Sequence, residues 1–131
     1  DKLIPKLKQP VLGICLGMQL LCDKTEEGDT TGLGIISSKV IRFPYSVKAP
    51  QMGWNVVRHS NSELFQDIQQ NCYMYLVHSY FVPLEPETLA KSNYAGEYSV
   101  AIKKNNFYGV QFHPEKSSKA GSQLLKNFLK I

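Results

Sequence analysis

Short apolar runs separated by polar turns fill the middle of the chain, whereas helical periodicity is confined mainly to its two ends. Residues 10–14 are apolar on both faces, which is typical of a buried parallel strand. The pattern of β-branched and aromatic residues predicts further strands at 34–43, 54–59, 73–78, 98–102 and 107–112. The middle of the chain therefore predicts a sheet.

Helical patterns flank these strands. Residues 2–8 place apolar side chains among lysines, which predicts the end of an amphipathic helix before Pro10. After Gly17, apolar positions recur at helical spacing through Met18, Leu21 and Cys22. The pattern then predicts an acidic loop at 23–31 and a short helix at 64–68.

The clearest helix is expected at 117–130, capped by Ser117 or Ser118. Its apolar stripe consists of Leu124, Leu125, Phe128 and Leu129. Strands combined with helices near both ends predict an α/β fold whose sheet is partly antiparallel in the middle.

Composition narrows the function classes. The 131 residues suit one domain and are too few for two. The net charge of +4 comes from lysines spread along the chain, so no dense basic stripe points to nucleic acid. No apolar run approaches the ~20 residues of a membrane helix, and the first residues do not resemble a signal peptide.

The cysteines indicate a reducing compartment, and hence a cytoplasmic protein. Their count is three, which is odd, and their spacing forms no disulfide framework. The absence of a C-x-x-C pair also argues against structural zinc. Cys22 and Cys72 read as core thiols.

Cys15 stands in a different setting, GICLG at positions 13–17, which has the form of a nucleophile elbow. In such an elbow a strand turns sharply into a helix, and flanking glycines keep side chains away from the nucleophile. The helix N-terminus favours the thiolate, and the N–H of Leu16 is placed to donate to an oxyanion. The alternative is a buried core cysteine between a strand and a helix.

A thiolate nucleophile needs a group that moves protons. His113 ends the expected strand 107–112, and the following Pro114 allows Glu115 to fold back onto the imidazole, giving a base and its orienter. The alternative is an exposed histidine beside an unrelated glutamate. His59 lies in a polar turn, and His78 reads as a core or edge histidine. Nothing in the spacing supports a metal site.

The segments GICLGMQ at 13–19 and QFHPEKS at 111–117 resemble those of class I (triad-type) glutamine amidotransferases. Within that class the chain is similar to the glutaminase subunits of imidazole glycerol phosphate synthase. The stretches that carry this closer resemblance are Met18 before Gln19, GLG at 32–34, MGWN at 52–55, VHSY at 77–80, and Lys116-Ser117.

The resemblance implies hydrolysis of L-glutamine to glutamate and ammonia through a thioester on Cys15, with no metal or organic cofactor. His113 would carry the proton, Glu115 would orient it, and Leu16 would supply an oxyanion N–H. The glutamine-binding residues would be Gln19, Ser79 and Tyr80.

The resemblance also implies a partner. Trp54, Tyr75 and Lys116 match positions that face a (β/α)8-barrel cyclase subunit, which would use the ammonia in histidine biosynthesis. The alternative for the two aromatic residues is ordinary core packing.

The chain departs from the family in two ways. The first strands and the Pro-Gly loop that supplies a second oxyanion donor are absent, so residues 1–131 are expected to form about the C-terminal two-thirds of a three-layer domain. Position 51 is Gln where the closer relatives usually have His. Two alternatives stay open: the amidotransferase of anthranilate synthesis, and a non-catalytic binding module with the same fold.

Overall fold

A six-stranded sheet forms the centre of the computed structural model, which describes residues 3–131. Its strands, in order across the sheet, are β1 (Val11–Ile14), β10 (Phe107–Val110), β9 (Glu97–Lys104), β8 (Thr88–Asn93), β5 (Gln51–His59) and β6 (Cys72–His78). Only β1 and β10 are parallel, and the other neighbouring pairs are antiparallel. The predicted α/β class with a mixed sheet is therefore confirmed.

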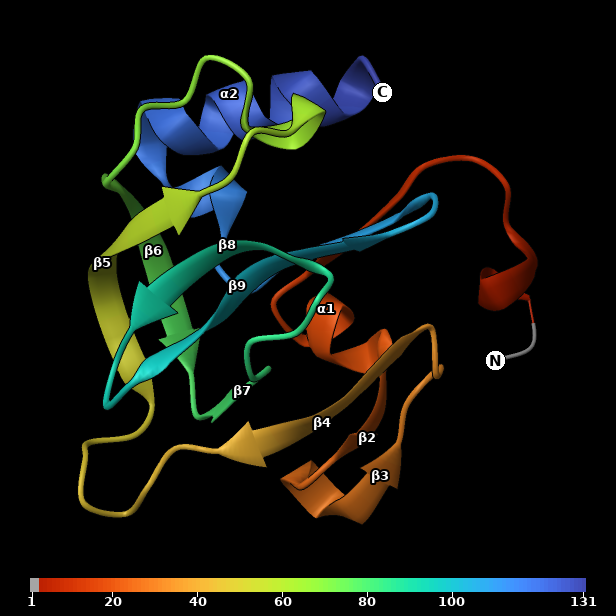
Figure 1. The fold of residues 1–131 in the computed structure, drawn as a ribbon. Coiled ribbons are helices and arrows are strands. Elements are labelled where there is room, and N and C mark those ends of the chain that lie inside the picture. The colour runs from red at the N-terminus through yellow and green to blue at the C-terminus, as the bar shows by residue number, and fades with distance from the viewer. Residues whose placement is uncertain (1–2) are drawn as a thin grey trace.

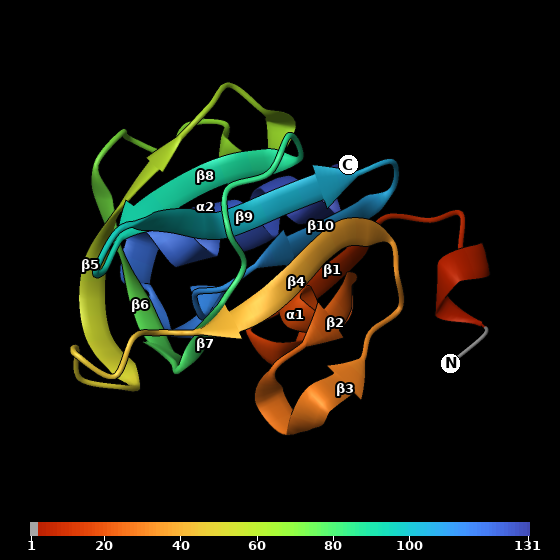
Figure 2. The same ribbon diagram turned by 60° about the horizontal axis from the view of Figure 1, so that its bottom comes forward.

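A smaller sheet lies beside the first. Its strands, in order, are β3 (Thr30–Thr31), β2 (Cys22–Thr25), β4 (Ile36–Arg42) and β7 (Tyr80–Phe81). This sheet and helix α1 (Leu16–Leu20) lie on one side of the large sheet, and helix α2 (Ser118–Leu129) lies on the other (Figure 1). Figure 2 shows the same layers after rotation. Short 3-10 turns occur at Ile4–Lys6, Glu27–Asp29, Glu63–Phe65 and Pro114–Lys116.

Each face of the large sheet packs against its own apolar core. Leu124 of α2 packs with Tyr108 and Phe112 in one core. Met18 of α1 packs with Ile36 and Phe107 in the other. Because alternate residues of a strand point to opposite faces, β10 supplies Phe107 to one core and Tyr108 to the other. The large sheet therefore anchors the segments on both of its sides.

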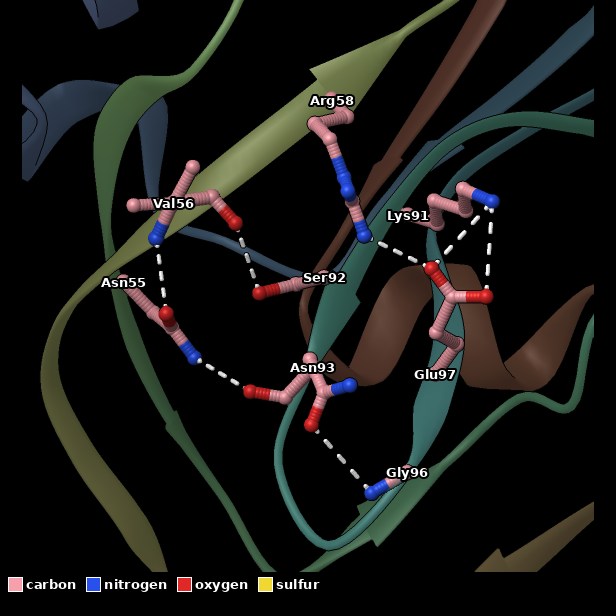
Figure 3. A network of polar contacts seen from close by, with 8 residues as sticks. All are labelled: Asn55, Val56, Arg58, Lys91, Ser92, Asn93, Gly96 and Glu97. Atoms are coloured by element: carbon pink, nitrogen blue, oxygen red, sulfur yellow. Dashed lines mark hydrogen bonds and ion pairs between the residues drawn. The ribbon is translucent and has the colours of Figure 1, made fainter.

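Side-chain hydrogen bonds connect β5 to β8 beyond the point where their backbone ladder ends. The ladder between these strands pairs only Arg58 with Lys91 and His59 with Ala90. Beyond it, the Ser92 hydroxyl donates to the Val56 carbonyl at 2.8 Å, and the Asn55 amide donates to the Asn93 carbonyl at 3.0 Å (Figure 3). The Glu97 carboxylate also binds Arg58 at 2.7 Å and Lys91 at 3.2 Å. These contacts hold β5 and β6 against the remaining strands of the large sheet.

The secondary structure predicted for the first 31 residues was partly wrong. The expected helix at 2–8 is only a 3-10 turn, Ile4–Lys6, and Lys2 lies outside the described residues. Helix α1 ends at Leu20, so Cys22 begins strand β2, and the expected loop at 23–31 holds parts of two strands. Residues 22–25 pair with β4, and this pairing outweighs the helical spacing of the apolar residues.

The expected strands are present, but β8 was not predicted, and residues 64–68 contain a 3-10 turn in place of a helix. In α2 the apolar stripe is also different, because Leu129 is 83% exposed and Asn127 is buried in its place. The Asn127 amide donates to the carbonyls of Leu64 and Gln66, at 2.9 and 2.7 Å. The Asn127 side chain thus binds α2 to the loop between β5 and β6.

Candidate active site

Cys15 occupies a strained turn between β1 and α1. Its φ of 56° and ψ of −107° lie outside the regions that non-glycine residues favour. Its N–H donates to the Val110 carbonyl at 2.7 Å, which continues the parallel β1–β10 ladder by one residue. A Cβ atom on Gly13 would come within 2.6 Å of the Gly17 backbone. Gly13 therefore permits the close approach of strand and helix in the elbow.

Opposing effects act on the Cys15 thiol. Partial burial is the largest, and it raises the pKa of Cys15 above its ordinary value. The Leu16 N–H and the Gln111 amide act to lower this pKa, while the charges of Glu115 and Glu27 act to raise it. The helix N-terminus expected to favour the thiolate does contribute through Leu16, but burial outweighs it. Cys15 is therefore a thiol at rest and needs a base.

His113 and Glu115 form a hydrogen-bonded pair beyond the end of β10. The His113 Nδ1 and a Glu115 carboxylate oxygen are 2.9 Å apart, so the other ring nitrogen, Nε2, remains for a substrate or a nucleophile. Partial burial acts to raise the pKa of Glu115, but its hydrogen bonds, first that from His113, and the nearby Lys116 lower it overall. Because β1 and β10 are parallel neighbours, Cys15 and His113 emerge from the same edge of the sheet.

Ser117 fixes the turn that carries His113. Its buried hydroxyl donates to the His113 carbonyl at 2.6 Å and accepts the Tyr75 N–H at 2.9 Å. The His113 N–H in turn donates to the Tyr75 carbonyl at 2.9 Å. Ser117 occupies the N-cap position of α2, as predicted, but its side chain makes no capping bond to the helix. The hydroxyl instead ties the His113 turn to strand β6.

Gln19 connects the elbow to the segment of Ser79 and Tyr80. Its amide nitrogen donates to the Tyr80 carbonyl and to the Gln111 side-chain oxygen, both at 3.0 Å. The Ser79 carbonyl accepts the Phe43 N–H at 3.0 Å. The four predicted substrate residues, Leu16, Gln19, Ser79 and Tyr80, thus lie on the two segments that meet at Cys15. Their roles toward glutamine remain predictions.

A buried polar network continues from Tyr80. The Tyr80 carbonyl lies 2.7 Å from His78 Nδ1, which therefore carries a proton, while His78 Nε2 faces the Tyr98 hydroxyl at 3.1 Å and the Gln51 amide at 3.3 Å. Burial lowers the pKa of His78 to about 4. His78 is thus the satisfied core histidine that the sequence allowed, and it is neutral at physiological pH.

Two of the predicted partner residues, Trp54 and Tyr75, lie side by side on neighbouring strands. Trp54 and Tyr75 are paired across β5 and β6, with ring centroids 5.9 Å apart and planes at 76°. Trp54 is 52% exposed, and so it is not part of the core. Its neighbours Met52 and Tyr73 are also exposed, at 65% and 60%. Lys116 is also exposed and lies on the turn that Ser117 ties to Tyr75.

The sequence reasoning gave no role to Gln111, although it stands in the quoted QFHPEKS segment. Its side chain is fully buried, and its amide nitrogen lies 3.6 Å from the Cys15 sulfur. The strand pairing could have revealed Gln111. Ile14 pairs with Val110 in the parallel ladder, so the residues that follow them, Cys15 and Gln111, are neighbours.

The other cysteines are free thiols. Cys22 is fully buried, as predicted, and burial raises its pKa to about 12. Cys72 is only half-buried on β6, so its assignment to the core was partly wrong. Within residues 3–131, no group of three or more His, Cys, Asp or Glu side chains could hold a metal ion. No helix in the same range is long and apolar enough to cross a membrane.

Comparisons with known proteins agree with this arrangement. The family model "Glutamine amidotransferase class-I" matches residues 1–131. The imidazole glycerol phosphate synthase subunit HisH of Bacteroides fragilis is 47% identical over 100% of this chain and 68% of its own length. HisH of Haemophilus influenzae is 53% identical over 96% and 64%, and that of Escherichia coli 49% over 98% and 67%. The chain thus spans about two-thirds of the length of these relatives.

Solved structures show the same fold. A putative GMP synthase subunit from Thermoplasma acidophilum matches with a TM-score of 0.72 at 22% identity, covering 98% of this chain and 60% of that one. A glutamine amidotransferase from Thermotoga maritima matches with a TM-score of 0.61 at 18% identity, covering 92% and 47%. The family expected from the two motifs is therefore confirmed: the chain belongs to the class-I glutamine amidotransferases, and within them to the family of the imidazole glycerol phosphate synthase subunit HisH.

Proposed function

We propose that the chain carries the catalytic triad of a glutaminase that hydrolyses L-glutamine to glutamate and ammonia for imidazole glycerol phosphate synthase. One observation carries this proposal. A strained cysteine elbow and a His113–Glu115 pair follow the carboxyl ends of two adjacent parallel strands, which is the arrangement that a nucleophile with its base and orienter requires.

The reaction begins with proton transfer from the Cys15 thiol to Nε2 of His113. Burial keeps the thiol protonated, and the Val77 carbonyl, 3.8 Å from the sulfur, can accept the S–H at rest. The Glu115 carboxylate faces Nδ1, fixes the tautomer of the neutral ring and stabilises the imidazolium that forms. The thiolate then attacks the carbon of the glutamine side-chain amide.

The tetrahedral intermediate places negative charge on the former amide oxygen, where the Leu16 N–H supplies a donor. Collapse of the intermediate breaks the C–N bond, and His113 gives its proton to the departing ammonia. Water, deprotonated by the same imidazole, then hydrolyses the γ-glutamyl thioester and regenerates the Cys15 thiol. Each proton that leaves the sulfur or the water thus passes through His113.

The partner in this proposal is a cyclase subunit that consumes the ammonia. Trp54, Met52 and Tyr73 give the β5–β6 hairpin an exposed apolar face, which suits a protein interface. Lys116 adds a positive charge beside the His113 turn. A cytoplasmic location is consistent with three unpaired cysteines.

The test is Cys15→Ser in the full-length protein, assayed with its cyclase partner. Glutamine-dependent synthesis should be lost, because a hydroxyl is a far weaker nucleophile than a thiolate at neutral pH. Synthesis with ammonium salts should persist, since the partner holds the ammonia-using site. Cys72→Ser is the matched control and should retain both activities. Glutamine hydrolysis by Cys15→Ser at the wild-type rate would refute the proposal. The absence of glutamine hydrolysis in the wild type as well would favour the alternative, a non-catalytic binding module.

A further inference from the structure

Gln111 reaches the nucleophile through the same ladder that positions Cys15. Its N–H donates to the Val100 carbonyl of β9 at 2.8 Å, so its backbone is held by the central sheet. Its neighbour Val110 accepts the Cys15 N–H at 2.7 Å. The Gln111 side chain is fully buried, and its amide nitrogen lies 3.6 Å from the Cys15 sulfur. Gln111 is therefore rigidly placed with respect to the nucleophile.

The orientation of the Gln111 amide follows from its second partner. The Gln111 oxygen accepts from the Gln19 amide nitrogen at 3.0 Å, and the same nitrogen donates to the Tyr80 carbonyl at 3.0 Å. Both hydrogens of the Gln19 amide are thus committed to oxygen acceptors. A reversed Gln111 amide would turn its NH₂ group toward that of Gln19 and its oxygen toward the sulfur. The NH₂ group of Gln111 must therefore face Cys15.

Gln111 and Val77 favour opposite charge states of Cys15. The Val77 carbonyl, 3.8 Å from the sulfur, is an acceptor and can bind only the protonated thiol. The Gln111 NH₂ group is a donor, and its hydrogen bond strengthens when the sulfur becomes negative. When the proton leaves, the contact with Val77 is lost and that with Gln111 is retained. Gln111 thus acts differently on the thiol and on the thiolate.

We propose that Gln111, oriented by Gln19, is the built-in donor that stabilises the Cys15 thiolate and holds its sulfur during catalysis. This role deepens the glutaminase proposal and rests on Cys15 being its nucleophile. It also explains a fully buried carboxamide between two apolar residues, Val110 and Phe112, where an aliphatic side chain would otherwise pack. Burial opposes ionisation of Cys15, and Gln111 partly offsets this effect.

The experiment measures the rate at which iodoacetamide alkylates Cys15 as a function of pH, with peptide mass mapping to separate Cys15 from Cys72. Gln111→Met keeps a side chain of similar length but removes the donor. Loss of a hydrogen bond to a charged group should reduce the Cys15 rate near neutral pH about tenfold and move the pH midpoint up by about one unit. Asn127→Leu, which removes a buried amide in another part of the fold, should lower stability without moving the midpoint.

An unchanged midpoint in folded Gln111→Met protein would overturn the proposal. If that variant fails to fold, Gln19→Met decides, because it removes the group that orients Gln111 and should raise the midpoint by a smaller amount. An unchanged midpoint in folded Gln19→Met protein would then overturn it. Alkylation requires neither glutamine nor the partner, so these results are separate from any failure of the glutaminase proposal.

Discussion

The buried imidazole of His78 should make the stability of the protein depend on pH. Burial lowers its pKa from 6.5 to about 4, and this effect outweighs the hydrogen bond to the Tyr80 carbonyl, which acts to raise the pKa. The unfolded chain therefore binds a proton at this site between about pH 6.5 and pH 4, and the native chain does not. Stability contributed by neutral His78 is thus fully present above pH 6.5 and is lost as the pH falls toward 4.

The magnitude follows from the difference in pKa. A shift from 6.5 to about 4 corresponds to about 3 kcal/mol, at about 1.4 kcal/mol per pH unit. About 2 kcal/mol of this should disappear between pH 7 and pH 5, where the unfolded state takes up most of its proton. This loss is a large fraction of the ~5–15 kcal/mol that stabilises a typical domain.

Urea denaturation at pH 7 and pH 5 measures the effect. The variant His78→Gln should be less stable than the wild type at both pH values. From pH 7 to pH 5, however, its free energy of unfolding should fall by about 2 kcal/mol less than that of the wild type. Tyr98→Phe serves as the control, because it removes the hydroxyl that contacts His78 and Gln51 but leaves the imidazole buried, and its pH dependence should persist. An equal loss of stability in wild type and His78→Gln would refute the assignment of a buried, neutral imidazole.

Further expectations concern the elbow, the His113 turn and the partner face. Gly13→Ala should distort the elbow, because its Cβ would lie 2.6 Å from the Gly17 backbone, and glutaminase assays should detect the loss; Gly17→Ala meets no atom within 4 Å and should be tolerated. Ser117→Ala should lower kcat and destabilise the protein by about 1–3 kcal/mol in urea titrations, since it leaves the Tyr75 N–H without its partner and removes one of the hydrogen bonds to the His113 carbonyl. The exposed Ser122→Ala should change neither quantity, and an equal effect would contradict the role of Ser117. Lys116→Glu should reduce the rise in glutaminase activity on addition of the cyclase subunit without altering the urea midpoint, whereas an effect no larger than that of Lys119→Glu would make Lys116 an ordinary surface lysine.

The parts of the site that the sequence revealed are local. The elbow at Cys15 and the turn from His113 to Glu115 each lie within a few residues, so their spacing alone carried the geometry. The central strands were also recognisable, because runs such as 73–78 are rich in β-branched and aromatic residues.

The parts that the sequence missed depend on contacts between distant segments. Ser117 looked like a helix cap, yet its hydroxyl serves Tyr75, which lies 42 positions earlier. Gln111 acquires its role only when β10 pairs with β1, and its sulfur contact spans 96 positions. Cys22 fits a helical pattern, but pairing with β4 places it in a strand. Tertiary partners, which no local pattern contains, decided each of these cases.

The central claim, that Cys15 is the nucleophile that attacks glutamine, is tested most directly by covalent trapping. Full-length protein, in the presence of the cyclase subunit, would be treated with an electrophilic diazoketone analogue of glutamine and digested for peptide mass mapping. We expect one adduct, on Cys15, that excess L-glutamine prevents and that accompanies complete loss of glutaminase activity. Cys72, which is half-buried on β6, should remain unmodified and provides the internal comparison. Complete inactivation with Cys15 unmodified, or with the adduct on another residue, would contradict the account.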